Sequence, residues 1–225
     1  MNQPSTDICL LVEGAYPYVK GGVSNWIHQL ILEQSHLTFQ IVSLVASPPK
    51  GGSLYQSPEN LVGLSHVYLQ TPPRGQRFFP RSSRFIKELE PHLIQFLQYG
   101  DLRSLENLLI VLQPVRKKVG GRQLLDSPSA WEMALRIYQE TLPNTSFLNF
   151  FWSLRSMLSS LYATLLTPIP QASVYHAIST GYAGLLLART RLETNSSTLI
   201  TEHGIYTNER RIELVMADWL AEGSS

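Results

Sequence analysis

Three stretches of the sequence place glycine, histidine and hydroxyl side chains where a short apolar run meets a helix-like pattern. They cover residues 13–26, 174–184 and 199–211. An apolar run that ends in a glycine-containing loop and continues with helical periodicity is typical of the strand–loop–helix unit of α/β proteins. Such loops present backbone N–H groups and polar side chains to ligands, so the three stretches predict a binding site.

The first stretch presents Gly21 and Gly22 at the start of a predicted helix, residues 23–32. We expect these glycines to be able to adopt positive φ angles and to offer N–H groups to a phosphate at the positive end of the helix dipole. Lys20 could add a positive charge, or could be an ordinary solvated lysine. A strand, two glycines and a helix also occur together for structural reasons alone, so this loop does not identify a ligand by itself.

The second and third stretches each contribute a histidine. His176 lies in a short apolar strand and is either a satisfied core histidine or a ligand contact. His203 lies in a strand-end loop, where it could hydrogen-bond a sugar hydroxyl or phosphate and change protonation near neutral pH. Glu202 could orient that imidazole or bind acceptor hydroxyls, and Thr180 and Gly181 are expected to cap the helix that follows them.

The third stretch continues with Gly204 and Tyr206 and opens a predicted helix. Arg210 lies in the first turn of that helix, where the dipole disfavours a positive charge. Such local conflicts are more common at functional sites, and Arg210 could pair with Glu202 or reach a phosphate, although a solvated arginine is an equal alternative. The predicted catalytic residues are His203 and Glu202; the predicted substrate- or phosphate-binding residues are Gly21, Gly22, Lys20, His176, Thr180, Gly181, Gly204, Tyr206 and Arg210.

The amino-acid composition indicates some classes of protein and argues against others. The 225 residues are 44% hydrophobic and carry 18 basic and 17 acidic side chains, a net charge of +1. This indicates a globular chain with no basic excess for nucleic acid. The single cysteine, Cys9, lies in an apolar run and is expected to be a buried hydrophobe. The polar N-terminus does not resemble a signal peptide, so we expect a cytoplasmic protein.

Apolar runs and periodicity predict an α/β fold. Predicted strands cover residues 8–12, 39–46, 64–69, 173–177 and 198–201. Predicted helices cover residues 23–32, 84–99, 101–113, 128–141, 145–166, 181–193 and 207–221. The alternation at both ends predicts a doubly wound parallel sheet with a helical block inserted over about 84–166. All three loops then leave the carboxyl ends of strands and can face one crevice beside the switch point of strand order.

Two helices carry further expectations. The helix at 23–32 is predicted to carry Val23, Trp26, Ile27, Leu30 and Ile31 on one face. The most apolar segment, residues 147–166, is interrupted by Arg155 and serines, so it is not read as a membrane span. Its helical spacing predicts a core-facing helix, with an interfacial or partner-docking role as the alternative.

The three stretches together resemble the N-terminal domain of the PelF-type enzymes among the family-4 retaining glycosyltransferases of the GT-B fold. The resemblance rests on Glu13-Gly14, on Tyr16-Pro17-Tyr18 with Gly21-Gly22, and on the loops that contain His176 and His203. It covers almost the whole chain and implies that residues 1–225 are a single Rossmann-like domain, the N-terminal half of a GT-B fold.

The resemblance implies an activity and its partners. The completed enzyme would transfer a hexose from a UDP-sugar to a growing exopolysaccharide with retention of configuration, without a metal or other cofactor. The family's C-terminal nucleotide-sugar domain is absent from this sequence, so we expect no turnover by this chain alone. Glu132 and Glu140 have the family's Glu-x7-Glu spacing but lie in the helical block, so they are not assigned to it.

Two alternatives remain open. The chain could be a non-catalytic remnant or binding module whose aromatic helical block docks a membrane-bound polysaccharide synthase, which would place it at the periphery of the inner membrane. It could also be a stand-alone nucleotide-binding protein, although no acidic ribose-binding residue follows the second strand. If a second domain restored activity, the chain would be half of an enzyme rather than a remnant or binding module. Tight nucleotide binding by this chain alone would instead favour the stand-alone nucleotide-binding protein.

Overall fold

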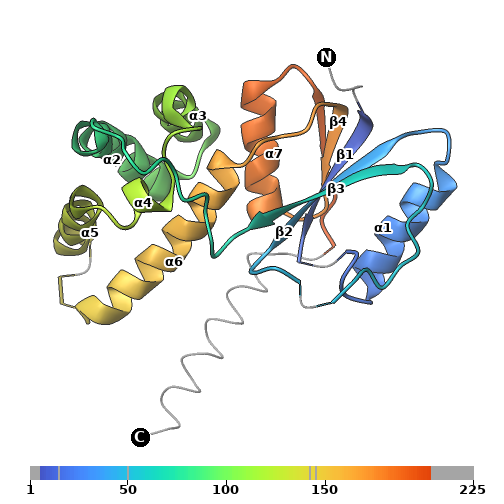
Figure 1. Cartoon of the computed structure of the whole chain (residues 1–225), viewed down its shortest axis with the longest axis horizontal. Helices are drawn as coiled ribbons and strands as arrows, with labels where there is room; N and C mark the ends of the chain where they lie inside the picture. The colour runs from blue at the N-terminus through green and yellow to red at the C-terminus, as the bar shows by residue number, and fades with distance from the viewer. Residues whose placement is uncertain (1–5, 15, 50, 142, 145, 204–225) are drawn as a thin grey trace, which may run out of the picture.

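The computed structural model describes residues 6–14, 16–49, 51–141, 143–144 and 146–203. The predicted helix at 207–221 and the candidate residues Gly204, Tyr206 and Arg210 lie outside these residues. The described part is a parallel sheet with helices on both faces, joined to a block of helices (Figure 1).

The sheet confirms the predicted α/β class. Its order is β3-β2-β1-β4-β5, and every neighbouring pair is parallel. The strands are β1 (Thr6–Glu13), β2 (Phe39–Val45), β3 (Leu61–Tyr68), β4 (Ala172–Ala177) and β5 (Ser197–Ile200). In β1, Leu10 is opposite Ile41 of β2 on one side and His176 of β4 on the other. The strand order therefore reverses at β1, as a doubly wound sheet requires.

The helices cover both faces of the sheet. They are α1 (Gly22–Glu33), α2 (Ser82–Tyr99), α3 (Leu102–Leu112), α4 (Gly121–Leu124), α5 (Pro128–Thr141), α6 (Phe147–Leu166) and α7 (Tyr182–Glu193), with a 3-10 turn η1 (Gln113–Val115). On one face, Ile27 and Ile31 of α1 pack with Leu10 of β1. On the other face, Leu186 of α7 packs with Leu11. This two-sided burial explains why β1 is a continuous apolar run.

Cys9 faces the α7 side of the sheet and is fully buried, as predicted from its apolar surroundings. Burial raises the pKa of its thiol to about 12, because the thiolate would lose its hydration. Cys9 is therefore a small core side chain.

The helical block between β3 and β4 has a core of its own, formed by apolar faces of α2, α3, α5 and α6. The prediction for α6 is confirmed for Leu154, Leu158, Leu161 and Leu165, which are all buried. The first turns of α6 instead carry half-buried aromatic rings, and Phe147 contacts Trp131 of α5 edge to face. The long helix α6 runs from this aromatic end to the sheet (Figure 1).

A buried arginine ties α6 to α7. Arg189 is 1% exposed, and its Nη1 donates to the backbone oxygens of Thr164 and Thr167 at the end of α6, both at 2.8 Å. Its Nε pairs with Glu193 at 3.2 Å, and Glu193 also pairs with Arg116. Helix carbonyls at a C-terminus need donors, and a guanidinium supplies several in one group. Arg189 thereby connects the helical block to the helix that packs on the sheet.

Two local differences from the predictions have clear causes. Strand β3 begins at Leu61, three residues before the predicted residue 64, because Leu61 and Gly63 already pair with Phe39 and Gln40 of β2. Between the predicted helices 101–113 and 128–141 the structure adds the short helix α4, whose first residues, Gly121 and Arg122, donate backbone N–H groups to segment 73–74.

We expect Arg189→Met to lower the free energy of unfolding by about 2 to 4 kcal/mol, because two helix-end carbonyls and Glu193 lose a buried donor. Arg191→Met is the matched control on the same helix. Arg191 is exposed, so its substitution should change stability by less than about 0.5 kcal/mol. Urea denaturation of both variants measures the difference; equal effects would contradict the role given to Arg189.

Candidate functional site

The carboxyl ends of β1, β4 and β5 lie at one edge of the sheet, beside the reversal of strand order. The parallel registers pair Leu11 with Ala177 and Ala177 with Ile200. The three loops predicted to form a site follow these strand ends. Because ligands of open α/β sheets bind outside the carboxyl ends of strands at a switch point, we define this position as the candidate site.

Trp26 brings the two candidate histidines together. Its ring lies 5.0 Å from that of His203, at 72° between planes, and 6.1 Å from that of His176, at 90°. Helical spacing placed Trp26 on the apolar face of α1 with Ile27 and Ile31; those two residues are buried, whereas Trp26 is 36% exposed. An exposed indole next to two imidazoles can pack its apolar ring against the apolar face of a ligand. Its N–H can bind the polar edge of that ligand.

His176 is both a buried residue and a member of this cluster. It is 7% exposed, and its Nε2 lies 2.8 Å from Thr201 Oγ1. Burial lowers its pKa below 6.5, and the neighbouring His203 lowers it further. The neutral imidazole is therefore the favoured form at neutral pH. His203 is exposed, so its imidazole is accessible to a ligand.

A carboxylate lies at the N-terminus of α7. Oε2 of Glu13, the last residue of β1, accepts hydrogen bonds from Ser179 Oγ and from the backbone N–H of Ala183, both at 3.3 Å. A Cβ on Gly181 would lie 2.4 Å from this oxygen, so only glycine leaves room for it. An acidic group at a helix N-terminus is electrostatically favourable. Glu13 therefore occupies the position where the Thr180–Gly181 loop was expected to receive a phosphate.

Thr180 has a different partner from the one predicted. Gly181 is the N-cap residue of α7, as expected, but no side-chain hydrogen bond caps this helix. Thr180 Oγ1 instead donates to Glu202 Oε1 at 3.2 Å. The capping role predicted for Thr180 is wrong because Thr180 precedes the N-cap residue, and the backbone N–H of Ala183 donates to Glu13 instead. The hydrogen bond from Thr180 to Glu202 connects the loops after β4 and β5.

The glycine loop differs from the predicted phosphate cradle. Gly21 is the N-cap residue of α1 and is fully extended (φ 178°, ψ 175°), and the positive φ predicted for Gly21 and Gly22 is not seen. Gly14, at the start of the loop, has φ 72°. An added Cβ on Gly21 or Gly22 meets no atom within 4 Å. The space over the start of α1 is therefore open, and Lys20 beside it is exposed.

Tyrosine–histidine pairs hold the glycine loop against the sheet. Tyr16 is buried, and its hydroxyl lies 3.1 Å from His28 Nδ1 on α1. The Tyr18 hydroxyl bonds to His66 Nε2 on β3, and His66 stacks on Tyr68. The loop that follows β1 thus extends across the end of β2 to reach β3. These residues were not assigned a role from the sequence, since a lone tyrosine or histidine gives no signal of its partner.

The described residues contain no cluster of three or more histidine, cysteine or acidic side chains that could hold a metal ion. No described helix is long and apolar enough to cross a membrane.

Comparison with protein families assigns the chain. Residues 6–225 match the model described as Domain of unknown function (DUF3492), which covers nearly the whole sequence. The chain belongs to the DUF3492 family. This domain is associated with glycosyltransferase-like proteins, which agrees with the parallel Rossmann-like sheet. No curated protein and no solved structure gave a significant match to this DUF3492 domain.

We expect His176→Gln to weaken the pH dependence of stability. The folded-state pKa of His176 lies below that of the unfolded chain, so the unfolded state takes up a proton first as the pH falls through about 6.5. Stability should therefore fall between about pH 7 and pH 5, and a glutamine should remove part of that fall.

Urea midpoints across this pH range measure the effect. Burial also lowers the pKa of His66, so some decline should persist in the variant. The exposed His36, changed to Gln, is the control and should leave the profile unchanged. A His176→Gln profile identical to that of the unmodified chain would contradict the assignment.

Proposed function

We propose that this DUF3492 domain is the acceptor-side half of a PelF-type, retaining GT-B glycosyltransferase. The completed enzyme would move a hexose from a UDP-sugar to a growing exopolysaccharide in the cytoplasm. The observation that carries the proposal is the meeting of Trp26, His176 and His203 at the switch point, where the loops after β4 and β5 join α1. Membership of a family associated with glycosyltransferase-like proteins supports it independently.

The side chains at this position suit a sugar. An indole ring offers an apolar surface to the C–H groups of a pyranose, while imidazole and carboxylate groups hydrogen-bond its hydroxyls. His203 and Glu202 are exposed, whereas His176 is buried behind Trp26. We therefore assign ligand contact to His203, Glu202 and Trp26, and a supporting position to His176.

The proposed reaction needs few groups from this half. The bond between the anomeric carbon and the UDP oxygen breaks, a bond to an acceptor hydroxyl forms, and the hydroxyl proton is released. His203 could accept that proton, because its imidazole is exposed beside Trp26 and imidazole is the commonest general base in enzymes. Open N–H groups at the start of α1, beside Lys20, could contribute to the diphosphate site. A second Rossmann-like domain, on the same or another polypeptide, would hold most of the nucleotide.

The assay is UDP release from UDP-glucose by the full-length product of the locus, or by this chain together with a separately encoded second domain. His203→Ala should lower kcat/KM by about 10- to 100-fold, since it removes a hydrogen bond of about 1.5–3 kcal/mol to a charged group. His36→Ala is the control and should retain full activity. Appreciable UDP release by this chain alone, or full activity of His203→Ala in the completed enzyme, would contradict the proposal.

One observation favours a second candidate function, a non-catalytic docking module. The free end of the helical block exposes large apolar side chains: Trp131 is 45% exposed and Leu148 is 63% exposed. A polysaccharide-synthase partner at the inner membrane could cover them. Absence of UDP release in the presence of a second domain, with co-purification of such a partner through Trp131 and Leu148, would favour this function.

A further inference from the structure

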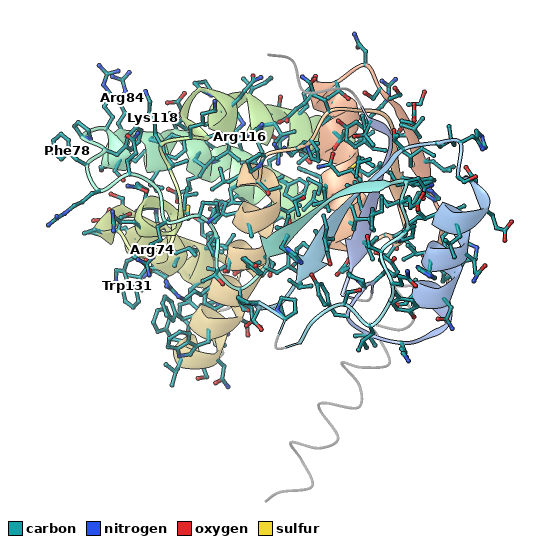
Figure 2. The ribbon with its side chains drawn as sticks, turned by 45° about the vertical axis from the view of Figure 1, so that its right-hand side comes forward. Arg74, Phe78, Arg84, Arg116, Lys118 and Trp131 are labelled. Carbon is teal, nitrogen blue, oxygen red and sulfur yellow. The ribbon has the colours of Figure 1, made fainter. Side chains whose placement is uncertain are left out.

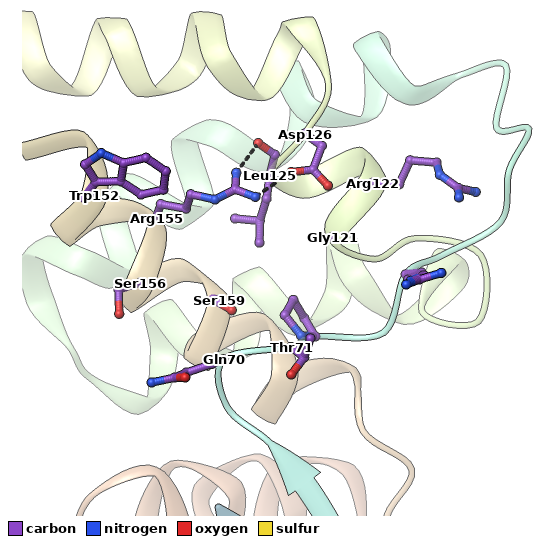
Figure 3. A pocket seen from close by; sticks show the side chains of 12 residues that line it. Gln70, Thr71, Gly121, Arg122, Leu125, Asp126, Trp152, Arg155, Ser156 and Ser159 are labelled. Carbon is purple, nitrogen blue, oxygen red and sulfur yellow. Dashed lines mark hydrogen bonds and ion pairs between the residues drawn. The ribbon is translucent and has the colours of Figure 1, made fainter. Parts of the chain in front are cut away.

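A hollow lies where the helical block meets the end of β3. It has a volume of about 640 Å³ and lies between α6, α4 and the segment 70–74 (Figure 3). Its lining includes Gln70 and Thr71 after β3, and Trp152, Arg155 and Ser156 on α6. This volume is in the range of small-ligand sites. The hollow is formed by other residues than the candidate site at the ends of β1, β4 and β5.

The walls of this hollow are held in place by backbone hydrogen bonds. Gly121 N–H donates to the Pro73 oxygen at 2.8 Å, and Arg122 N–H donates to the Arg74 oxygen at 3.2 Å. A Cβ on Gly120 would lie 1.9 Å from the Pro73 oxygen, so the backbones at Gly120 and Pro73 are in direct contact and leave no room for a side chain. On the other wall, Ser159 Oγ donates to the Leu69 oxygen at 3.1 Å. The site is therefore preformed, as binding pockets usually are.

The lining combines an aromatic face with a fixed guanidinium. Trp152 is 58% exposed, and its ring lies beside Arg155 (Figure 3). Arg155 Nη1 donates to the Leu125 oxygen at 3.0 Å and Nη2 pairs with Asp126 at 2.6 Å, which positions the group and leaves other N–H donors free for a ligand. An exposed indole beside oriented donors suits a sugar ring, which has C–H groups on its faces and hydroxyls at its edge.

The net charge of the residues that line the hollow indicates which class of saccharide would bind there. The lining includes three arginines, Arg74, Arg122 and Arg155, and one carboxylate, Asp126. Asp126 pairs with Arg155, and among the residues that the structure describes neither Arg74 nor Arg122 forms a salt bridge. Figure 2 shows Arg74 on the surface of the helical block. The excess positive charge favours a ligand that carries carboxylates, which arginine binds with paired N–H donors.

The hollow lies on the same edge of the sheet as the candidate site. Segment 70–74 follows the carboxyl end of β3, and β3 is separated from β1 only by β2, about 10 Å for two strand spacings. The loop after β1 forms the surface of that interval, because the Tyr18 hydroxyl bonds to His66 on β3. A short oligosaccharide could therefore extend from one position to the other along this edge.

We propose that the hollow between α6, α4 and segment 70–74 binds an acidic oligosaccharide, the preceding units of the acceptor chain. The indole of Trp152 stacks on a sugar ring, and Arg155 and Arg74 bind its carboxylates. The assignment of this saccharide as the acceptor rests on the proposed glycosyltransferase function. Binding itself is a property of this chain and does not require turnover.

Isothermal titration calorimetry with a short oligogalacturonate tests the site directly. The methyl-esterified form of the same oligosaccharide is the neutral control ligand. We expect the acid form to bind at least tenfold more tightly than the ester, Trp152→Ala to weaken binding at least tenfold, and Arg74→Gln to weaken it severalfold. Arg77→Gln, a change at an exposed residue of the same loop that does not line the hollow, should leave the affinity unchanged.

Unchanged affinity in Trp152→Ala, equal binding of acid and ester, or no binding of either would overturn the proposal. Trp152 is exposed and outside the buried cores, so a change in its unfolding midpoint is not expected. UDP release by the completed enzyme is measured separately. Binding that depends on Trp152 without any UDP release would contradict the proposed function while supporting a saccharide site. UDP release together with oligosaccharide binding that Trp152→Ala does not weaken would contradict the saccharide site in the hollow, but not the proposed glycosyltransferase function.

Discussion

The parallel pairing of β1 with both β2 and β4 is the constraint on which the candidate site depends. It reverses the strand order at β1 and so leaves a position at the carboxyl edge that no crossover helix covers. Loops far apart in the sequence then meet there. Glu13 at the end of β1 hydrogen-bonds the start of α7, and Thr180 after β4 hydrogen-bonds Glu202 after β5. Because these contacts are made by polar groups, the folded edge is already suited to a polar ligand.

The helical block extends this edge and is held by buried contacts. Arg189 connects the end of α6 to α7, and Ser159 of α6 hydrogen-bonds the backbone just after β3. These contacts fix α6 against the sheet at both its middle and its end. Trp152 and Arg155, on the same helix, are therefore held beside the carboxyl end of β3. If the proposed saccharide site is correct, the insertion would enlarge the site from one sugar to a chain.

Much of the fold could be predicted from the sequence, because buried parallel strands are continuous apolar runs and the helices of the insertion have clear periodicity. The convergence of the histidine loops also followed from topology, since parallel strands end at one edge. Trp26 could not be predicted: helical spacing places it beside Ile27, and only the packing of α1 shows that the indole faces His203. The role of Glu13 likewise depends on a distant neighbour, Ser179, which is 166 residues away. The extended conformation of Gly21 depends on the local path of the loop.

The central claim is that the switch-point position contacts the sugar donor and acceptor. A crystal structure of the completed enzyme with bound UDP-glucose tests it most directly. We expect the hexose within hydrogen-bond distance of His203 or Glu202 and beside Trp26, with the diphosphate near the start of α1. A nucleotide-sugar bound at another face of this domain, with Trp26 and His203 in contact only with protein, would contradict it.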